Sequence, residues 1–175
     1  MKTLVLGGTR SGKSRHAETR ALSLPVARWF YVATAQAGDD EMAARIQHHR
    51  EQRDTRWQTM EAPRALGACL RRLDGPDRCI LVDCLTLWLS NCLAEDTGTL
   101  TWAEERDALL AAVDASRARL IFVSNEVGSG IVPLGALSRR FADEAGRLHQ
   151  ALAERCDTVT LVVAGLPLTL KENGA

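Results

Sequence analysis

Gly7, Gly12, Lys13 and Ser14 stand at the spacing G-x-x-x-x-G-K-[ST], directly after the apolar residues of LVLGGTRSGKS. Glycines let a backbone curl so that its N–H groups point at phosphate oxygens, and a following helix adds partial positive charge. Lys13 would neutralise the β- and γ-phosphates, and the Ser14 hydroxyl would ligate Mg²⁺. The pattern therefore predicts a nucleotide site rather than a glycine turn with an incidental lysine. The expected loop residues are Gly7, Gly8, Thr9, Arg10, Ser11, Gly12, Lys13 and Ser14.

Asp83 follows four apolar residues in the stretch CILVDC. A phosphate-binding loop works with a carboxylate at the end of a neighbouring strand, which holds the metal or its waters. Asp83 is therefore the second candidate metal ligand, although a lone acid at that place can also cap the helix that follows.

The stretch DDEMAARIQHHREQR, residues 39–53, has the period of a helix. On such a helix His49 lies between Arg45, one turn before it, and Arg53, one turn after it. Neighbouring positive charges disfavour the imidazolium form, and a neutral imidazole can attack phosphorus. His48 and His49 could equally be solvated residues of a surface helix, and the sequence by itself leaves both interpretations open.

The elements around these residues alternate between short apolar runs and longer segments of helical period. Strands without polar alternation are typical of a sheet covered on both faces, so we expect an α/β fold: a P-loop NTPase-like three-layer sandwich with a mainly parallel central sheet. The expected strands are Thr3–Leu6, Trp29–Ala33, Cys79–Asp83, Leu120–Ser124 and Val159–Ala164. The expected helices are Lys13–Leu22, Asp39–Arg53, Arg64–Leu73, Leu85–Leu93, Trp102–Ser116 and Leu137–Arg155.

Composition limits the function classes. The 175 residues predict a single domain over 1–175, and 22 basic residues balance 22 acidic ones, so no bulk positive field draws the chain to nucleic acid. No stretch approaches the ~20 apolar residues of a membrane span, and the short apolar run near the N-terminus is no signal-peptide core, so we expect a cytoplasmic protein. Five cysteines without C-x-x-C spacing are expected to be reduced and mostly buried.

Eight segments together resemble one known family. They are GGTRSGKSRHAE, YVATAQ, DDEMAARIQHHREQR, WQTMEAP, VDCLTLWLSN, SNEVGSGIVP, RRFADEAGRLHQ and LVVAGLPLTLK, and the match as a whole runs in order from residue 3 to about residue 171. In this respect the chain is similar to the bifunctional adenosylcobinamide kinase / adenosylcobinamide-phosphate guanylyltransferase family of cobalamin assembly.

The resemblance implies two reactions and a nucleophile. A nucleoside triphosphate, ATP or GTP, phosphorylates the aminopropanol hydroxyl of adenosylcobinamide; GTP then donates GMP to the new phosphate of adenosylcobinamide phosphate, and pyrophosphate is released. In the family the second step passes through a GMP-histidine intermediate. The family pattern R-I-x-x-H-R falls on Arg45, Ile46, His49 and Arg50, which makes His49 the implied nucleophile and His48 the reserve.

The resemblance also implies a guanine-nucleotide site. Its residues would be Ala33, Thr34, Ala35, Arg50, Glu51, Gln52, Arg53, Glu61 and Asp83. A carboxylate such as Glu61 could accept hydrogen bonds from guanine N1 and N2, although caps and surface acids are common uses of glutamate. The loop SNEVGSGIVP, with Glu126, Gly128 and Gly130, is interpreted as a substrate-side loop, with a structural glycine turn as the alternative.

The chain departs from the family pattern G-R-x-N-Q at one position, where it has His149 in GRLHQ. A harmless polar substitution on a helix face is the favoured interpretation. The resemblance suggests a homo-oligomer, in particular a homotrimer, and the apolar surface candidates for contacts between subunits are Trp88 and Trp102.

Two alternatives remain from the sequence. One is a P-loop kinase of another small alcohol or nucleoside with no transferase activity, and the other is a non-catalytic nucleotide sensor. A switch GTPase is disfavoured because the chain has no Asn-Lys dipeptide and hence no N-K-x-D guanine-reading motif.

Overall fold

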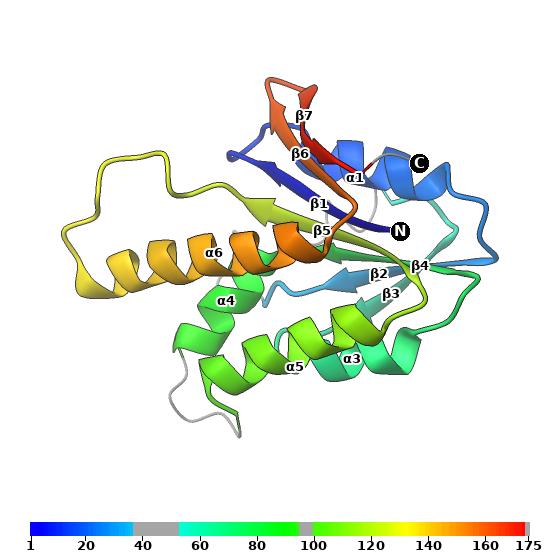
Figure 1. Ribbon diagram of the computed structural model, residues 1–175, viewed down its shortest axis with the longest axis horizontal. Helices are drawn as coiled ribbons and strands as arrows, with labels where there is room; N and C mark the ends of the chain where they lie inside the picture. Colours follow the sequence, from blue (N-terminus) through cyan, green and yellow to red (C-terminus); the bar gives the residue numbers. More distant parts are fainter. Residues whose placement is uncertain (37–52, 95–99, 174–175) are drawn as a thin grey trace.

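One mostly parallel sheet organises the chain. The computed structural model describes residues 1–36, 53–94 and 100–173, and in these residues seven strands lie in the order β3-β2-β4-β5-β1-β6-β7 (Figure 1). Every neighbouring pair is parallel except β6 and β7, which are antiparallel. The strands are β1 Lys2–Gly7, β2 Arg28–Ala33, β3 Trp57–Glu61, β4 Arg78–Asp83, β5 Arg119–Asn125, β6 Thr158–Val163 and β7 Leu166–Glu172.

Helices cover both faces of this sheet. The described helices are α1 Lys13–Leu22, α3 Leu66–Leu73, α4 Leu85–Ala94, α5 Trp102–Ala115 and α6 Ala136–Arg155. Figure 1 shows α1 on the opposite side of the sheet from α3, α5 and α6. On β1, Leu4 and Leu6 belong to the core beneath α3, α4, α5 and α6, whereas Val5 belongs to the core beneath α1. This two-sided burial confirms the predicted three-layer α/β sandwich.

The five predicted strands are present, with small shifts. The strand predicted as Val159–Ala164 runs from Thr158 to Val163, because Ala164 has φ of 51° and begins the turn into β7. The strands β3 and β7 were not predicted. Both lie at the edges of the sheet and have mostly exposed residues, so they lack the continuous apolar pattern that identified the others.

The predicted helices agree with the structure to within a few residues where both can be compared. The helix predicted from Arg64 begins at Leu66 instead, since Ala65 has the left-handed φ of 52°. The helix predicted over Asp39–Arg53 lies outside the described residues apart from Arg53, which is in a bend.

Two predictions about side-chain exposure have different outcomes. All five cysteines are free and buried, as predicted. The proposal of Trp88 and Trp102 as surface residues is wrong: their exposed fractions are 0% and 7%, and they pack edge to face with ring centroids 5.2 Å apart. The Trp102 Nε1–H also donates to Glu144 Oε2 at 2.7 Å, which satisfies the polar end of the buried ring. Among the described residues no helix has the length and apolarity needed to cross a membrane.

Asp74 joins the end of α3 to the link between α5 and β5. Its Oδ1 accepts hydrogen bonds from Ser116 Oγ at 2.6 Å, the Arg117 N–H at 2.9 Å and the Ala118 N–H at 3.0 Å. Partial burial raises the pKa of Asp74, but these hydrogen bonds to the carboxylate outweigh it and hold the pKa below its ordinary value. The charged carboxylate therefore stabilises the fold.

Replacing this carboxylate should destabilise the protein in a pH-dependent way. We expect Asp74→Ala to lower the free energy of unfolding at pH 7 by about 1–3 kcal/mol, because three donors lose their acceptor. Since the folded-state pKa is depressed, the wild-type advantage is complete above the unfolded pKa of about 4 and is lost as pH falls through the folded pKa. Urea unfolding between pH 7 and pH 2 measures both effects.

The matched control is Asp107→Ala. Asp107 is exposed and pairs with its neighbour Arg106 at 2.8 Å, so its loss should change stability by less than about 0.5 kcal/mol. Equal losses for the two variants, or a constant difference down to pH 2, would contradict the assigned role of Asp74.

Candidate functional site

The predicted phosphate loop connects β1 directly to α1. Arg10 and Gly12 have left-handed φ values of 56° and 92°, so the backbone curls tightly before the helix starts. Among the described residues no side chain caps the N-terminus of α1, and its first turn contains no acidic residue. The unpaired N–H groups and positive dipole end of this helix are therefore available to an anion such as a phosphate.

The loop is packed against the turn between β6 and β7. The Gly165 N–H donates to Ser11 O at 2.8 Å, and a Cβ on Gly12 would lie 3.2 Å from Gly165 Cα. At the end of β1, a Cβ on Gly7 would lie 2.5 Å from Ser11 Oγ and 2.6 Å from Val162 O. Gly7 therefore has to be glycine because other atoms approach it too closely for a Cβ. Gly12 has to be glycine because its φ is left-handed and because Gly165 lies close to it.

Lys13 lies at the base of the loop. Its side chain is 9% exposed, and Nζ donates to Gly8 O at 3.1 Å, so the ammonium is held against the loop backbone. Ser14 is half-buried in the first turn of α1. Thr9 and Arg10 are exposed in the loop.

Three further predicted residues end neighbouring strands at the same edge. In the sheet register Ala33 of β2 stands opposite Glu61 of β3 on one side and Asp83 of β4 on the other. Asp83 is in turn opposite Val123 of β5, which adjoins β1. Since neighbouring strands lie about 4.8 Å apart, the register brings these strand ends and the phosphate loop to one edge of the sheet.

Asp83 and Thr34 have different surroundings. The Tyr31 hydroxyl donates to Asp83 Oδ2 at 2.8 Å. Thr34 Oγ1 instead bonds the backbone of Cys84, donating to its carbonyl at 2.7 Å and accepting from its N–H at 2.9 Å, while Asn91 donates to Thr34 O at 2.8 Å. The two hydrogen bonds of Thr34 Oγ1 therefore fix the backbone directly after Asp83. Ala35, the next residue, is half-buried.

Charged groups surround Asp83. The charges of Lys13 and Asp83 both act on the buried Cys84 thiol, whose pKa is raised by burial and by Asp83 and lowered by Lys13. Burial and the charge of Asp83 also raise the pKa of Glu18, which lies on α1 four residues after Ser14, against a smaller opposite effect of Arg53. Lys13, Glu18, Arg53 and Asp83 thus form one charged neighbourhood beside the loop.

These groups fit a magnesium ion bound together with a nucleotide. Ser14 and Asp83 could supply hard oxygen ligands, and Mg²⁺ in nucleotide sites takes one or two such protein groups, with phosphate oxygens and water completing its shell. The described residues contain no group of three or more His, Cys, Asp or Glu side chains that could hold a metal alone.

The predicted nucleophile and its neighbours lie outside the described residues. These positions are His48, His49, Arg50, Glu51 and Gln52. Arg53, which follows them, is described: its guanidinium carbon lies 3.7 Å from the centroid of the Tyr31 ring, and Nη1 donates to Thr59 Oγ1 at 3.4 Å. Arg53 therefore contacts the ring of Tyr31, the residue whose hydroxyl donates to Asp83.

The loop after β5 also lies at this edge. The Glu126 N–H donates to Gly7 O at 3.1 Å, and the Glu126 carboxylate accepts from the N–H groups of Gly128 at 2.7 Å and Ser129 at 3.3 Å.

His149 reaches this edge from α6, with Nε2 2.7 Å from Ser124 Oγ. His149 therefore lies on a helix, as predicted, and its half-buried ring contacts a buried serine near the end of β5.

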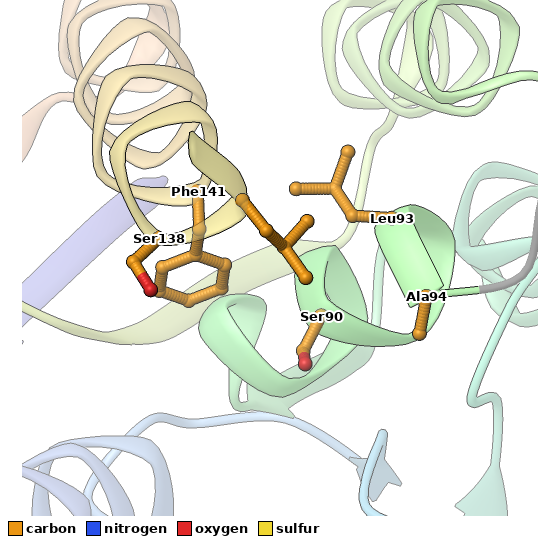
Figure 2. A pocket seen from close by; sticks show the side chains of 6 residues that line it. Ser90, Leu93, Ala94, Ser138 and Phe141 are labelled. Carbon is orange, nitrogen blue, oxygen red and sulfur yellow. The ribbon is translucent and has the colours of Figure 1, made fainter. Parts of the chain in front are cut away.

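A pocket elsewhere in the fold contains none of the described site residues. It has a volume of about 290 Å³ and lies between α4 and α6 (Figure 2). Its lining is Ser90, Leu93, Ala94, Leu137, Ser138 and Phe141.

Sequence reasoning missed Tyr31, Glu18 and Ser124 as neighbours of the site. Tyr31 and Ser124 stand within apolar runs, where the pattern predicts buried strand positions and gives no sign of a site. Glu18 had a usable signal, because it lies at i+4 from Ser14 and so on the same face of α1.

A family model described as cobinamide kinase / cobinamide phosphate guanyltransferase matches residues 3–170 of this chain. The chain belongs to that family. It is 56% identical over 172 residues to the bifunctional adenosylcobalamin biosynthesis protein CobP of Pseudomonas aeruginosa, with 98% of each chain covered. It is 43% identical over 183 residues to CobU of Salmonella typhimurium, with 98% of this chain and 100% of that one covered.

Membership in the cobinamide kinase / cobinamide phosphate guanyltransferase family makes the chain an enzyme of cobalamin biosynthesis with kinase and guanylyltransferase activities, as the sequence resemblance implied. Solved structures support the fold alone. The RadB recombinase has a TM-score of 0.53 at 18% identity, covering 91% of this chain and 72% of its own. The flagellar accessory protein FlaH of Methanocaldococcus jannaschii has a TM-score of 0.53 at 11% identity, covering 98% and 78%.

The two adjacent glycines of the loop should respond differently to an added methyl group. We expect Gly7→Ala to lower the free energy of unfolding by about 1–3 kcal/mol, because its Cβ would overlap Ser11 Oγ and Val162 O. A Cβ on Gly8 meets no atom of the described residues within 4 Å, so Gly8→Ala should change stability by less than about 0.5 kcal/mol. Urea unfolding without nucleotide measures both, and equal effects would show that the loop is not tightly packed at Gly7.

Proposed function

We propose that this chain catalyses both reactions at one nucleotide site. ATP or GTP phosphorylates the aminopropanol hydroxyl of adenosylcobinamide, and GTP then transfers GMP to adenosylcobinamide phosphate, which yields adenosylcobinamide-GDP and pyrophosphate. The observation that carries the proposal is the arrangement of the loop: an uncapped α1 N-terminus, with Lys13 at its base, stands at the sheet edge where Asp83 ends β4. We infer that residues 1–175 act as one domain.

In the kinase reaction the protein's main tasks are to position the phosphates and to stabilise their charge. The loop N–H groups and Lys13 would grip the β- and γ-phosphates while the corrinoid hydroxyl attacks the γ-phosphorus and the nucleoside diphosphate leaves. Ser14 and Asp83 would hold Mg²⁺, which supplies positive charge to the phosphate oxygens. Because the transition state is stabilised electrostatically, a strong general base is not required.

In the transferase reaction His49 would be the nucleophile. A neutral imidazole nitrogen forms a bond to the α-phosphorus of GTP as the bond to pyrophosphate breaks; a phosphate oxygen of the corrinoid substrate then takes the GMP group and frees the histidine. Three residues separate His49 from Arg53, so their Cα atoms are at most about 14 Å apart along an extended chain, and the Arg53 guanidinium contacts the Tyr31 ring. This span is compatible with a histidine that reaches the loop.

The guanine side of the site would lie at the ends of β2 and β3. Glu61 ends β3 opposite Ala33, where its carboxylate could accept from guanine N1 and N2. Ala35 and Arg53 would complete this side together with Arg50, Glu51 and Gln52.

We also infer a homo-oligomer, with a homotrimer as the expected form. Two apolar surfaces support association: the segment after β5 exposes Ile131 by 97% and Leu134 by 99%, and the β6–β7 hairpin exposes Leu166 by 72%. Light scattering in solution would test the oligomeric state.

The balanced net charge supports a protein that does not bind nucleic acid, and five free cysteines are consistent with the reducing cytoplasm.

A covalent intermediate should be visible as added mass. Incubation with GTP and Mg²⁺ should increase the intact mass of the wild-type chain by one GMP group, and the His48→Ala control should gain the same mass. His49→Ala should gain none, because it lacks the nucleophile. A GMP adduct on His49→Ala would overturn the assignment, and its absence from the wild type would leave a kinase without this transfer mechanism.

Loss of the loop lysine should impair both reactions together. We expect Lys13→Ala to lower kcat/KM for phosphorylation of adenosylcobinamide and for GMP transfer by a factor of roughly 10² or more, because each reaction loses a charge that stabilises its leaving or transferring phosphate. Thr19→Ala is the control on the exposed side of α1, where Oγ1 donates to the Arg15 carbonyl, and it should retain both rates. If Lys13→Ala lost one activity only, the two reactions would not share this nucleotide site.

A further inference from the structure

Tyr31 is the one tyrosine of the chain, and it lies in the interior of β2. Its side chain is 3% exposed and belongs to the core beneath α1. In the sheet register it stands opposite Leu81 of β4, so Asp83, two residues further along, projects from the same face. The phenol reaches along the sheet to that carboxylate, and its hydroxyl donates to Asp83 Oδ2 at 2.8 Å.

The ring of Tyr31 makes a second contact with the site. The Arg53 guanidinium carbon lies 3.7 Å from the ring centroid, which is the geometry of a cation–π contact. Trp57 of β3 packs edge to face against the same ring at 5.7 Å and 85°, which helps to hold the ring in place. Tyr31 therefore touches two predicted nucleotide-site residues, Asp83 through its hydroxyl and Arg53 through its face.

Packing alone does not require the hydroxyl. A phenylalanine would fill the same position beneath α1, and a buried hydroxyl is unfavourable unless it is hydrogen-bonded. The partner of this hydroxyl is a carboxylate at the functional edge rather than a backbone group of the core. A donor fixed to Oδ2 restricts rotation of the carboxylate and leaves its orientation set by a rigid strand.

We propose that Tyr31 is a positioning residue for both transfers: its hydroxyl orients Asp83, and its ring seats Arg53. This inference rests on the proposed function, in which Asp83 helps to hold Mg²⁺ and Arg53 lines the guanine-nucleotide site. Tyr31 itself touches no reacting atom. Its two contacts can be removed separately, because Tyr31→Phe loses only the hydroxyl and Tyr31→Leu loses the ring as well.

The hydroxyl is tested by the magnesium dependence of both reactions. We expect Tyr31→Phe to raise the Mg²⁺ concentration for half-maximal rate about 10-fold, within the 10–100-fold range typical of partners that orient metal ligands. The KM for the corrinoid substrate should stay unchanged, and saturating Mg²⁺ should restore most of the rate. In an Asp83→Asn background the same change should alter the magnesium dependence less than about 2-fold, since the oriented carboxylate is already gone.

The ring is tested by the GTP dependence of GMP transfer. Tyr31→Leu should raise the KM for GTP about 5-fold beyond the effect of Tyr31→Phe, on the basis of a cation–π contact at a partly exposed site. In an Arg53→Met background Tyr31→Leu should cause no further rise. Trp29→Phe is the control on the same strand: it removes a hydrogen bond from Nε1 to Ala21 O at 2.9 Å, away from Asp83, and should leave both constants unchanged.

The outcomes separate this inference from the proposed function. A wild-type chain with neither activity would refute the proposed function. If the wild type is active and Asp83→Asn has the same Mg²⁺ concentration for half-maximal rate, the assigned role of Asp83 is refuted. If Asp83→Asn impairs the magnesium dependence while Tyr31→Phe leaves it unchanged, or if Tyr31→Phe is equally harmful in the Asp83→Asn background, the positioning role of Tyr31 is overturned.

Discussion

The close packing of the phosphate loop against the β6–β7 turn is the constraint on which the site depends. The loop has to direct its N–H groups toward a ligand while its other side is held against the β6–β7 turn. The hydrogen bond from the Gly165 N–H to Ser11 O provides part of that support. The lack of space for a Cβ at Gly7 shows how closely the backbone segments approach. A loose loop would have to be ordered by each nucleotide that binds, at a cost in conformational entropy.

Parallel pairing then determines what lies opposite the loop. In such a sheet the carboxyl ends of the strands share one edge, so residues distant in sequence, such as Glu61, Asp83 and Glu126, come to the same side as Gly7. Burial on both faces makes this edge rigid, because the strands cannot shift register without moving apolar side chains out of two cores. The same rigidity fixes the distance between a buried tyrosine in β2 and the carboxylate in β4 that accepts its hydrogen bond.

The sequence was most informative where one physical requirement dominates. Continuous apolar runs identified the five inner strands, because burial on both faces requires them, and the glycine spacing identified the loop before α1. Edge strands escaped detection, since β3 and β7 are largely exposed and follow no single pattern. Trp88 and Trp102 were misplaced because large aromatic residues suit both a core and an interface, and only packing distinguishes the two. Contacts such as Tyr31–Asp83 depend on register between strands, which local sequence does not encode.

The burial of all five cysteines has a practical meaning. Burial raises the pKa of Cys79, Cys92 and Cys156 to about 12, so almost no thiolate forms near neutral pH, and oxidants and alkylating reagents act mainly on thiolates. Labelling of these side chains consequently requires the surrounding structure to open. The rate at which a thiol reagent modifies the native protein thus reports the frequency of unfolding, region by region, without any introduced probe.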